Sequence, residues 1–150
     1  MSSPPKIRSL ALNLLALREH SKFELQQKLC KRGFAEASVA AVIQDLAEKG
    51  LQSDDRFVEG YVVMRQKRGF GPRRIQMELT ERGIDKEQGE DFLKSNDASW
   101  LEVAQETRVK KFGEKAPRDS RAWLQQMRYL YYKGFTGDQI KKVFGHEKDL

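Results

Sequence analysis

The sequence predicts an all-α protein, an elongated, right- or left-curved stack of three tandem three-helix repeats with about nine helices. Three observations lead to this prediction. A leucine, three residues, a glycine and an apolar residue recur at 29–34, 79–84 and 130–135, and the glycines lie 50 and 51 residues apart (83 − 33 and 134 − 83). Patterns typical of helix starts recur at related places, and the apolar residues between them follow helical spacing.

The recurring glycine is expected to end a helix in the same way each time. Glycine suits the position after a helix because that position often needs a left-handed backbone. The leucine and the apolar residue on either side of it are the two that touch in a Schellman motif. Arg32, Arg82 and Lys133 precede the three glycines, where a cation favours the negative end of the helix dipole. Gly50 is expected to end a further helix with the same chemistry.

Helix starts are indicated by a short polar residue followed three positions later by an acid or amide, the capping-box pattern. The pattern occurs at Ser21 and Glu24, Asp85 and Gln88, Ser99 and Glu102, and Thr136 and Gln139. Together with apolar spacing of i, i+3, i+4 and i+7, these signals predict helices at 6–19, 22–32, 36–49, 54–68, 72–82, 86–95, 99–112, 120–133 and 137–145. We expect a flexible tail at 1–5 and three-helix repeats at 6–50, 51–96 and 97–150.

The composition agrees with a stack of small cores. Hydrophobic residues make up 39% and charged residues 33% of the 150 residues, which is little apolar material for one large core. In a repeat stack each unit buries its apolar face against its neighbour. The single cysteine, Cys30, is expected to pack in its helix and fits a reducing compartment. No apolar run approaches the length of a membrane span, so we expect a cytoplasmic protein without a membrane partner.

The sequence offers little for catalysis. Its two histidines, His20 and His146, have no second ligand or base at a useful spacing, and we expect both at the solvated surface. Gly69-x-Gly71 follows no strand, and no phosphate-binding loop motif occurs. The sequence therefore predicts no catalytic, cofactor-binding or metal-binding residues, no cofactor, and no enzymatic activity.

The basic residues are the main candidates for binding. The net charge is +6, and the segment 65–74 contains five cations and no acid: Arg65, Lys67, Arg68, Arg73 and Arg74. This segment spans a predicted joint between two helices, where two helix ends bring their charges together. Such a cluster suits a polyanion or an acidic protein surface.

A second candidate group lies on the predicted helix 120–133. Arg121 and Arg128 accompany Tyr132, which lies away from the core seam expected at Trp123, Met127 and Leu130. Basic and aromatic side chains together can hold a strand of bases, but they can equally anchor a protein interface.

The residues at 54–65, 68–75 and 78–84 closely resemble the central signature of the RecX family. The segment 14–21, with Leu25, Leu29, Gly33 and Phe34, looks like that family's first unit, and 133–135 with Ile140 looks like its last. The resemblance covers nearly the whole chain. Val58, Gly89 and the pair Tyr131-Tyr132 depart from the usual pattern.

The resemblance implies a non-catalytic negative regulator of the RecA recombinase, acting in homologous recombination, DNA repair and the SOS response. Similar proteins bind the RecA filament in its helical groove, block its extension or favour its disassembly, and depress its ATPase, strand-exchange and co-protease activities. The expected partner is therefore the RecA filament on single-stranded DNA, bound by a monomer that has at most weak affinity for DNA alone. Eight residues are expected to contact the filament or its DNA: Arg65, Lys67, Arg68, Arg73, Arg74, Arg121, Arg128 and Tyr132.

Two other hypotheses remain open on the sequence. The first is a direct DNA-binding helical module without recombinase specificity, built from the helix-turn-helix-like pairs of each unit. It predicts tight, salt-sensitive binding to DNA alone. The second is a helical scaffold for some other partner.

Overall fold

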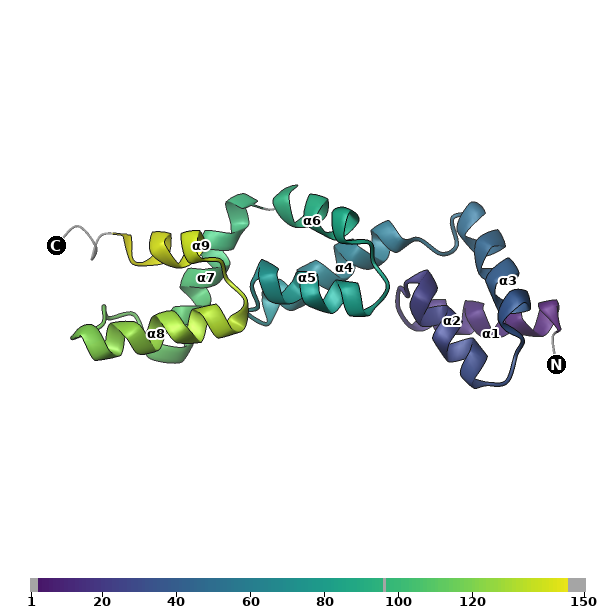
Figure 1. Ribbon diagram of the computed structural model, residues 1–150, viewed down its shortest axis with the longest axis horizontal. Coiled ribbons are helices and arrows are strands. Elements are labelled where there is room, and N and C mark those ends of the chain that lie inside the picture. Colours follow the sequence, from purple (N-terminus) through teal and green to yellow (C-terminus); the bar gives the residue numbers. More distant parts are fainter. Residues whose placement is uncertain (1–2, 96, 146–150) are drawn as a thin grey trace. The chain divides into compact units, whose positions relative to one another are not determined.

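The computed structural model describes residues 3–95 and 97–145, and every regular element within them is an α-helix (Figure 1). The helices of this part of the chain are α1 (Pro4–Leu17), α2 (Lys22–Lys31), α3 (Glu36–Glu48), α4 (Asp54–Lys67), α5 (Pro72–Glu81), α6 (Lys86–Ser95), α7 (Asp97–Phe112), α8 (Ser120–Lys133) and α9 (Gly137–Val143). The prediction of an all-α chain with nine helices is confirmed for these residues.

Two helix starts differ from the prediction. Helix α1 begins at Pro4, two residues earlier than expected, because proline fits the first turn of a helix, where its missing N–H is not needed. Helix α7 begins at Asp97, so the prediction of Ser99 as its N-cap was wrong. The Ser99 hydroxyl instead accepts a hydrogen bond from Gln66 Nε2 at 3.1 Å. The capping boxes at Ser21 and Thr136 are confirmed.

The glycine helix ends are confirmed by backbone geometry. Gly33, Gly50, Gly83 and Gly134 all have φ between 74° and 109°, in the left-handed region. At Gly83 the amide of the next residue donates to Leu79 O at 3.0 Å, and at Gly134 the corresponding bond to Leu130 O is 3.2 Å. In a Schellman motif the residue after the glycine makes this hydrogen bond to the carbonyl five positions earlier.

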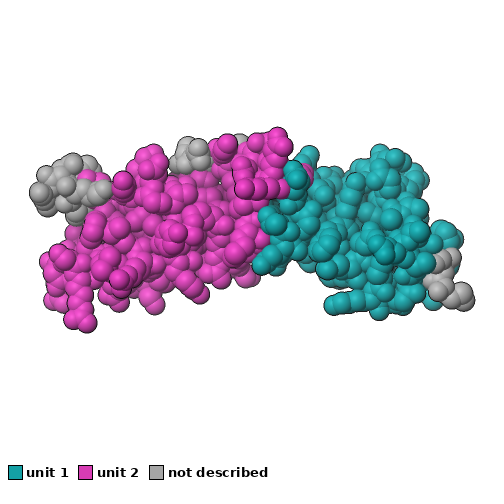
Figure 2. Space-filling view, in the orientation of Figure 1, with its two compact units in different colours: residues 1–60, 79–85 teal, residues 61–78, 86–150 magenta. Residues whose placement is uncertain are grey.

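The chain forms two compact units, which Figure 2 colours separately. The first comprises residues 1–60 and 79–85, and its main core lies among α1, α2 and α3. That core contains Ile7, Ala11, Leu25, Leu29, Val39, Val42, Ile43 and Leu46, all at most 9% exposed. Cys30 is partly buried against this core, as the sequence predicted.

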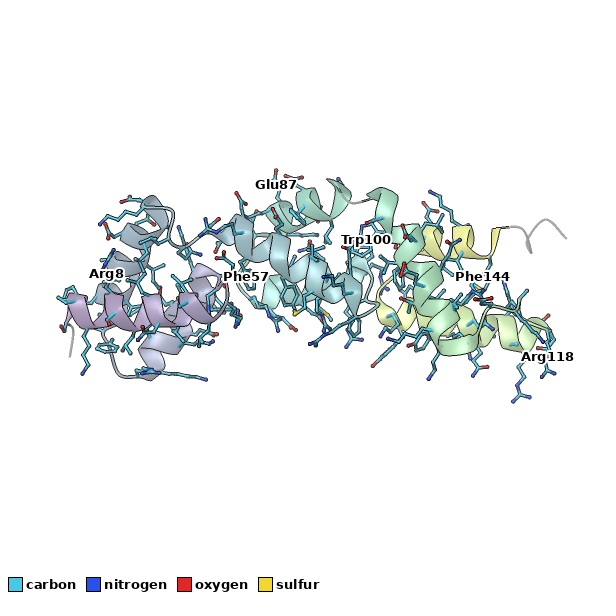
Figure 3. The ribbon with its side chains drawn as sticks, turned by 180° about the vertical axis from the view of Figure 1, so that it is seen from behind. Arg8, Phe57, Glu87, Trp100, Arg118 and Phe144 are labelled. Carbon is cyan, nitrogen blue, oxygen red and sulfur yellow. The ribbon has the colours of Figure 1, made fainter. Side chains whose placement is uncertain are left out.

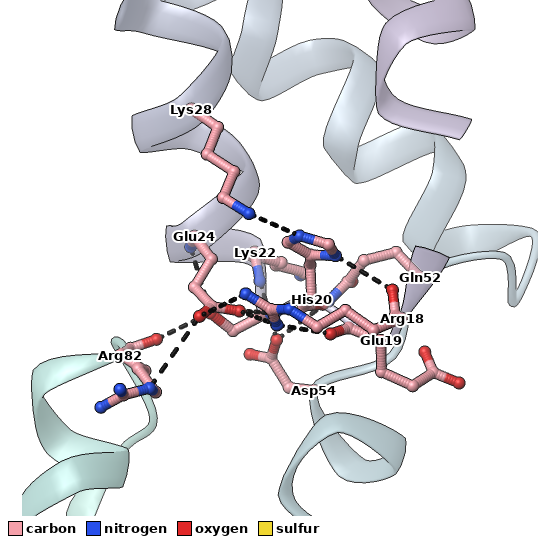
Figure 4. A network of polar contacts seen from close by, with 10 residues as sticks. Arg18, Glu19, His20, Lys22, Glu24, Lys28, Gln52, Asp54 and Arg82 are labelled. Atoms are coloured by element: carbon pink, nitrogen blue, oxygen red, sulfur yellow. Dashed lines mark hydrogen bonds and ion pairs between the residues drawn. The ribbon is translucent and has the colours of Figure 1, made fainter. Parts of the chain in front are cut away.

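His20 lies at the centre of a polar network in the first unit (Figure 4). The expectation that it lies at the solvated surface was wrong, because its side chain is buried. Both ring nitrogens have partners, which makes this burial possible: Nδ1 lies 3.0 Å from Arg18 O, and Nε2 lies 2.9 Å from Lys28 Nζ. Lysine can only donate, so Nε2 accepts and Nδ1 carries the proton. His146 lies outside the described residues.

The same network attaches the turn between α5 and α6 to the start of α2. Ser21 Oγ, which caps α2, also donates to Arg82 O at 2.7 Å. Gln52 Nε2 donates to His20 O at 3.1 Å, which joins the loop before α4 to the same point. The first unit is therefore fastened by hydrogen bonds between residues up to 61 positions apart in the sequence.

The second unit comprises residues 61–78 and 86–150. Its largest buried side chains are Trp100, Phe135 and Phe144, and Figure 3 shows Trp100 and Phe144 on α7 and at the end of α9. Trp100 Nε1 donates to Leu93 O at 3.1 Å, so the indole is satisfied although it is buried. Helix α7 packs against α8 and α9 and thereby positions the exposed face of α8.

Candidate functional site

The joint between α4 and α5 has the shape that its glycines indicated. Gly69 has a φ of 83°, and the amide of Phe70 donates to Arg65 O at 3.1 Å, so α4 ends in a further Schellman motif. Pro72 then begins α5 at once. The joint is only four residues long, from Arg68 to Gly71, so the cations at the end of α4 and those at the start of α5 are held close together.

This joint is attached to the turn between α8 and α9 by two backbone hydrogen bonds. Gly71 N donates to Lys133 O, and Arg73 N donates to Gly134 O, each at 2.8 Å. A Cβ atom at Gly71 would lie 2.5 Å from backbone atoms of Gly134 and Phe135. Only glycine permits this approach, which places the start of α5 beside the end of α8.

The ring of Phe70 lies at the centre of a group of cations. Lys133 Nζ lies 3.8 Å, the Arg65 guanidinium 3.9 Å and the Arg74 guanidinium 4.7 Å from the ring centroid. Cation–π attraction offsets part of the repulsion among them. Burial lowers the pKa of Lys133, and the positive charges of Arg74, Arg65 and Lys110 lower it further.

Glu78 is the counter-ion inside this cluster. Arg65 donates to both of its carboxylate oxygens at 2.8 Å, and Tyr61 Oη donates to Oε1 at 2.9 Å. Arg74 Nε lies 3.5 Å from Oε2. Burial favours the protonated acid, but the hydrogen bonds from Arg65 and Tyr61 outweigh it and lower the pKa of Glu78.

The bidentate pair with Glu78 gives Arg65 a structural task. Its side chain is 13% exposed, and that of Glu78 is 12% exposed. A guanidinium held by two charge-assisted hydrogen bonds at this depth fixes α4 against α5. The side chains of Lys67 and Arg68, in contrast, are exposed and make no hydrogen bond or ion pair with any residue that the structure describes.

Arg73 and Arg74 cover the two tyrosines at the end of α8. The Arg73 guanidinium lies 3.9 Å from the centroid of Tyr131, and Nη1 donates to Tyr131 O at 3.0 Å. The Arg74 guanidinium lies 5.2 Å from the centroid of Tyr132. Tyr132 is 69% exposed, which confirms its predicted position on the outer side of α8.

The remaining candidates on α8 separate into two groups. Arg128 shares a surface hollow with Arg73 and Tyr132. Arg121, in the first turn of α8, is exposed and does not line that hollow. The structure thus brings together Arg65, Arg73 and Arg74 near the joint and places Arg128 and Tyr132 beside them. Lys67 and Arg68 lie at the joint with exposed side chains, whereas Arg121 lies at the opposite end of α8.

Sequence reasoning did not assign Phe70, Tyr131 or Lys133 to the site. Phe70 stood in the signature only as part of the joint, and no periodic signal distinguishes a ring that binds cations from one that belongs to a core. Lys133 lies in the cluster because its carbonyl oxygen accepts the hydrogen bond from Gly71 N. That contact joins residues 62 positions apart (133 − 71), and the sequence carried no sign of it.

Residues 3–95 and 97–145 include no group of three or more histidine, cysteine, aspartate or glutamate side chains placed to hold a metal ion. None of the helices in this part of the chain combines the length and the apolar character needed to cross a bilayer.

Comparison with known proteins bears on the whole chain. Sequence models of three successive domains, the first, second and third three-helix domains of RecX, match residues 8–46, 53–93 and 97–144. The chain belongs to the RecX family. The three domain matches and the helices together confirm the tandem three-helix architecture.

Individual RecX proteins align over almost the full length. The regulatory protein RecX of Ectopseudomonas mendocina is 36% identical over 143 residues, which is 95% of each chain. That of Halorhodospira halophila is 42% identical over 135 residues, covering 90% of this chain and 84% of its own. The crystal structure of RecX from Lactobacillus salivarius superposes with a TM-score of 0.81 at 24% identity, covering 98% of this chain and 97% of that one, and shares its fold.

Proposed function

We propose that the chain is a non-catalytic negative regulator that binds the RecA filament on single-stranded DNA. On this proposal it blocks extension of the filament or promotes its disassembly, and so depresses ATPase, strand-exchange and co-protease activity. Membership of the RecX family supports a regulatory role, because its relatives carry the name regulatory protein RecX. The same proposal makes the protein a cytoplasmic monomer, with repeat boundaries at 6–50, 51–96 and 97–150.

The observation that carries the proposal is the basic and aromatic surface around the α4–α5 joint. Arg73, Arg74 and Lys133 gather there in a part of the second unit where Glu78 is the acid paired with the cluster. A nucleoprotein filament exposes phosphates and protein surface, and a fixed group of cations suits phosphates or acidic side chains. The backbone bonds from Gly71 and Arg73 hold this group in place before the partner arrives, which reduces the entropy lost on binding.

Within this surface the residues have different tasks. Arg65 maintains the joint through Glu78, so we propose that it positions the site without touching the partner. The side chains of Lys67 and Arg68 have no hydrogen-bond or ion-pair partner among the described residues, so their charge is available for contact. We propose Lys67, Arg68, Arg73, Arg74, Arg121, Arg128 and Tyr132 as the contacting residues.

The experiment is the DNA-stimulated ATPase of the cognate RecA, with this protein added at well below one copy per recombinase. We expect inhibition at concentrations at which the protein alone leaves the DNA free. The double variant Lys67→Glu with Arg68→Glu should inhibit at least about tenfold more weakly, because two free cations become anions. The matched control, Lys6→Glu with Lys31→Glu, makes the same charge change on exposed residues of α1 and α2 and should inhibit normally.

Two results would contradict the proposal. Tight binding to bare single-stranded DNA, with a salt dependence of about 0.7 log units per phosphate contact, would identify a direct DNA-binding module. The absence of any inhibition at equal concentrations would leave a helical scaffold for a different partner.

A further inference from the structure

A hollow of about 630 Å³ lies on the outer side of α8 and α9 in the second unit. Its apolar lining comes from Leu124 and Met127 of α8 and Ile140 of α9. Leu124 is 43% exposed and Tyr131, at the same hollow, is 56% exposed. Apolar side chains that are exposed together at one depression, and not scattered singly, are typical of interaction surfaces.

The charged residues of the hollow all have the same sign. Arg73, Arg128 and Lys141 line it, and no acidic residue of the described chain does. The side chains of Arg128 and Lys141 are exposed and make no hydrogen bond or ion pair with another described residue. An apolar depression bordered by unpaired cations attracts a ligand that combines apolar groups with negative charge.

Two features favour a protein segment over a strand of bases. Each tyrosine at the hollow already has a guanidinium over its ring, Arg73 at 3.9 Å from Tyr131 and Arg74 at 5.2 Å from Tyr132. A guanidinium over one face leaves only the opposite face of each ring for stacking with a base. Aliphatic and methionine side chains between tyrosine and arginine are, in contrast, typical of the central residues of protein interfaces.

We propose that this hollow binds an acidic, amphipathic helical segment of a partner protein. The segment's apolar face lies on Leu124 and Met127, and its carboxylates pair with Arg128 and Lys141. Helices bind to grooves in this way through apolar residues at i, i+3, i+4 and i+7. This inference adds a binding mode to the proposed function. It rests on that function in one respect: the regulated partner must contribute protein, and not DNA alone, to the contact.

The test uses the full-length protein and a fluorescein-labelled synthetic peptide of about 15 residues, with leucine at the helical positions and glutamate elsewhere. Fluorescence anisotropy should show binding of this peptide and at least about tenfold weaker binding of a scrambled peptide of the same composition, which lacks an apolar face.

Matched variants locate the binding. Lys141→Glu should weaken binding at least about fivefold, whereas Lys142→Glu should change it less than about twofold, because Lys142 is also exposed but does not line the hollow. Leu124→Ser should also weaken binding, and circular dichroism checks that each variant keeps its helices.

Three outcomes would overturn the proposal. Equal binding of the scrambled peptide, or equal losses in the two lysine variants, would mean that only overall charge matters. If oligo(dT) displaces the peptide, and if Lys141→Glu but not Lys142→Glu abolishes oligo(dT) binding, the hollow is a nucleic-acid site. If the protein inhibits RecA but binds neither peptide, the proposed role of the hollow is refuted and the proposed function stands. Failure of the hollow proposal is therefore distinguishable from failure of the proposed function.

Discussion

Replacing Gly71 by alanine tests the contact that builds the candidate site. The new Cβ would lie 2.5 Å from Gly134 C and Phe135 N and 2.6 Å from Gly134 O. All three are backbone atoms, so no flexible side chain can move aside. The α4–α5 joint must therefore withdraw from the α8–α9 turn, which lengthens or breaks the two 2.8 Å hydrogen bonds from Gly71 and Arg73.

The cost of Gly71→Ala follows from these contacts. Overpacking costs about 1–3 kcal/mol, and each lost backbone hydrogen bond costs about 1 kcal/mol. The reduced freedom of the unfolded chain returns about 0.4–1 kcal/mol. We expect the free energy of unfolding of the second unit to fall by about 2–4 kcal/mol. Recombinase inhibition should weaken as well, because Arg73 and Lys133 no longer lie in their places.

Urea denaturation followed by circular dichroism measures this loss. Gly137→Ala is the matched control, because it makes the same substitution in the same unit at a site where the added Cβ meets no atom within 4 Å beyond its chain neighbours and its own helix backbone. It should leave the free energy of unfolding unchanged or raise it by less than about 1 kcal/mol. If Gly71→Ala unfolds at the same urea concentration as the unaltered chain, the joint does not depend on this approach and the reasoning is refuted.

Glu78→Gln should lower the free energy of unfolding by about 2–3 kcal/mol at neutral pH, because Arg65 loses its charge-assisted bonds in a site that is mostly buried. Because folding lowers the pKa of Glu78, the stabilisation by its carboxylate is present above the ordinary pKa of 4.5 and is lost as the pH falls. The urea midpoints of the unaltered chain and of Glu78→Gln should therefore converge in acid. A constant difference between these midpoints from pH 7 to pH 3 would contradict this. His20 behaves in the same direction for a different reason. Burial and the nearby charges of Arg18 and Lys28 lower its pKa, so the stability of the first unit should fall as the pH drops below 6.5, where the unfolded chain takes up a proton first. His20→Asn should remove most of that slope in thermal unfolding curves between pH 7 and pH 5.5, and an identical slope in both proteins would rule out His20 as its source.

Much of the fold was predictable because it rests on local chemistry. The glycine helix ends, the capping boxes at Ser21 and Thr136 and the spacing of Val39 to Leu46 each involve residues within one turn or two. Such signals survive in a single sequence. Local signals fail where a more distant contact decides the structure. Ser99 lies inside α7, and its hydroxyl accepts a hydrogen bond from Gln66 of α4 instead of capping α7.

The candidate site was predictable only as a set of residue types. The run of cations at 65–74 was visible, but its division into structural and available charges was not. Arg65 is committed to Glu78, 13 positions away, and Arg73 to carbonyls 58 and 62 positions away. His20 shows the same limit, since its burial depends on Lys28 and on Gln52, which lie on other elements. Pairings of this kind are set by the packing of helices, and nothing in the local sequence announces them.

The most direct test of the central claim compares two affinities of one labelled protein. Its binding is measured by fluorescence anisotropy on single-stranded DNA alone and on the same DNA covered by the cognate RecA, at one fixed salt concentration. We expect binding to the RecA filament to be at least about a hundredfold tighter than to the bare strand, because protein contacts add to the electrostatic attraction. Equal affinity for the two would show that the chain recognises DNA and not the recombinase filament.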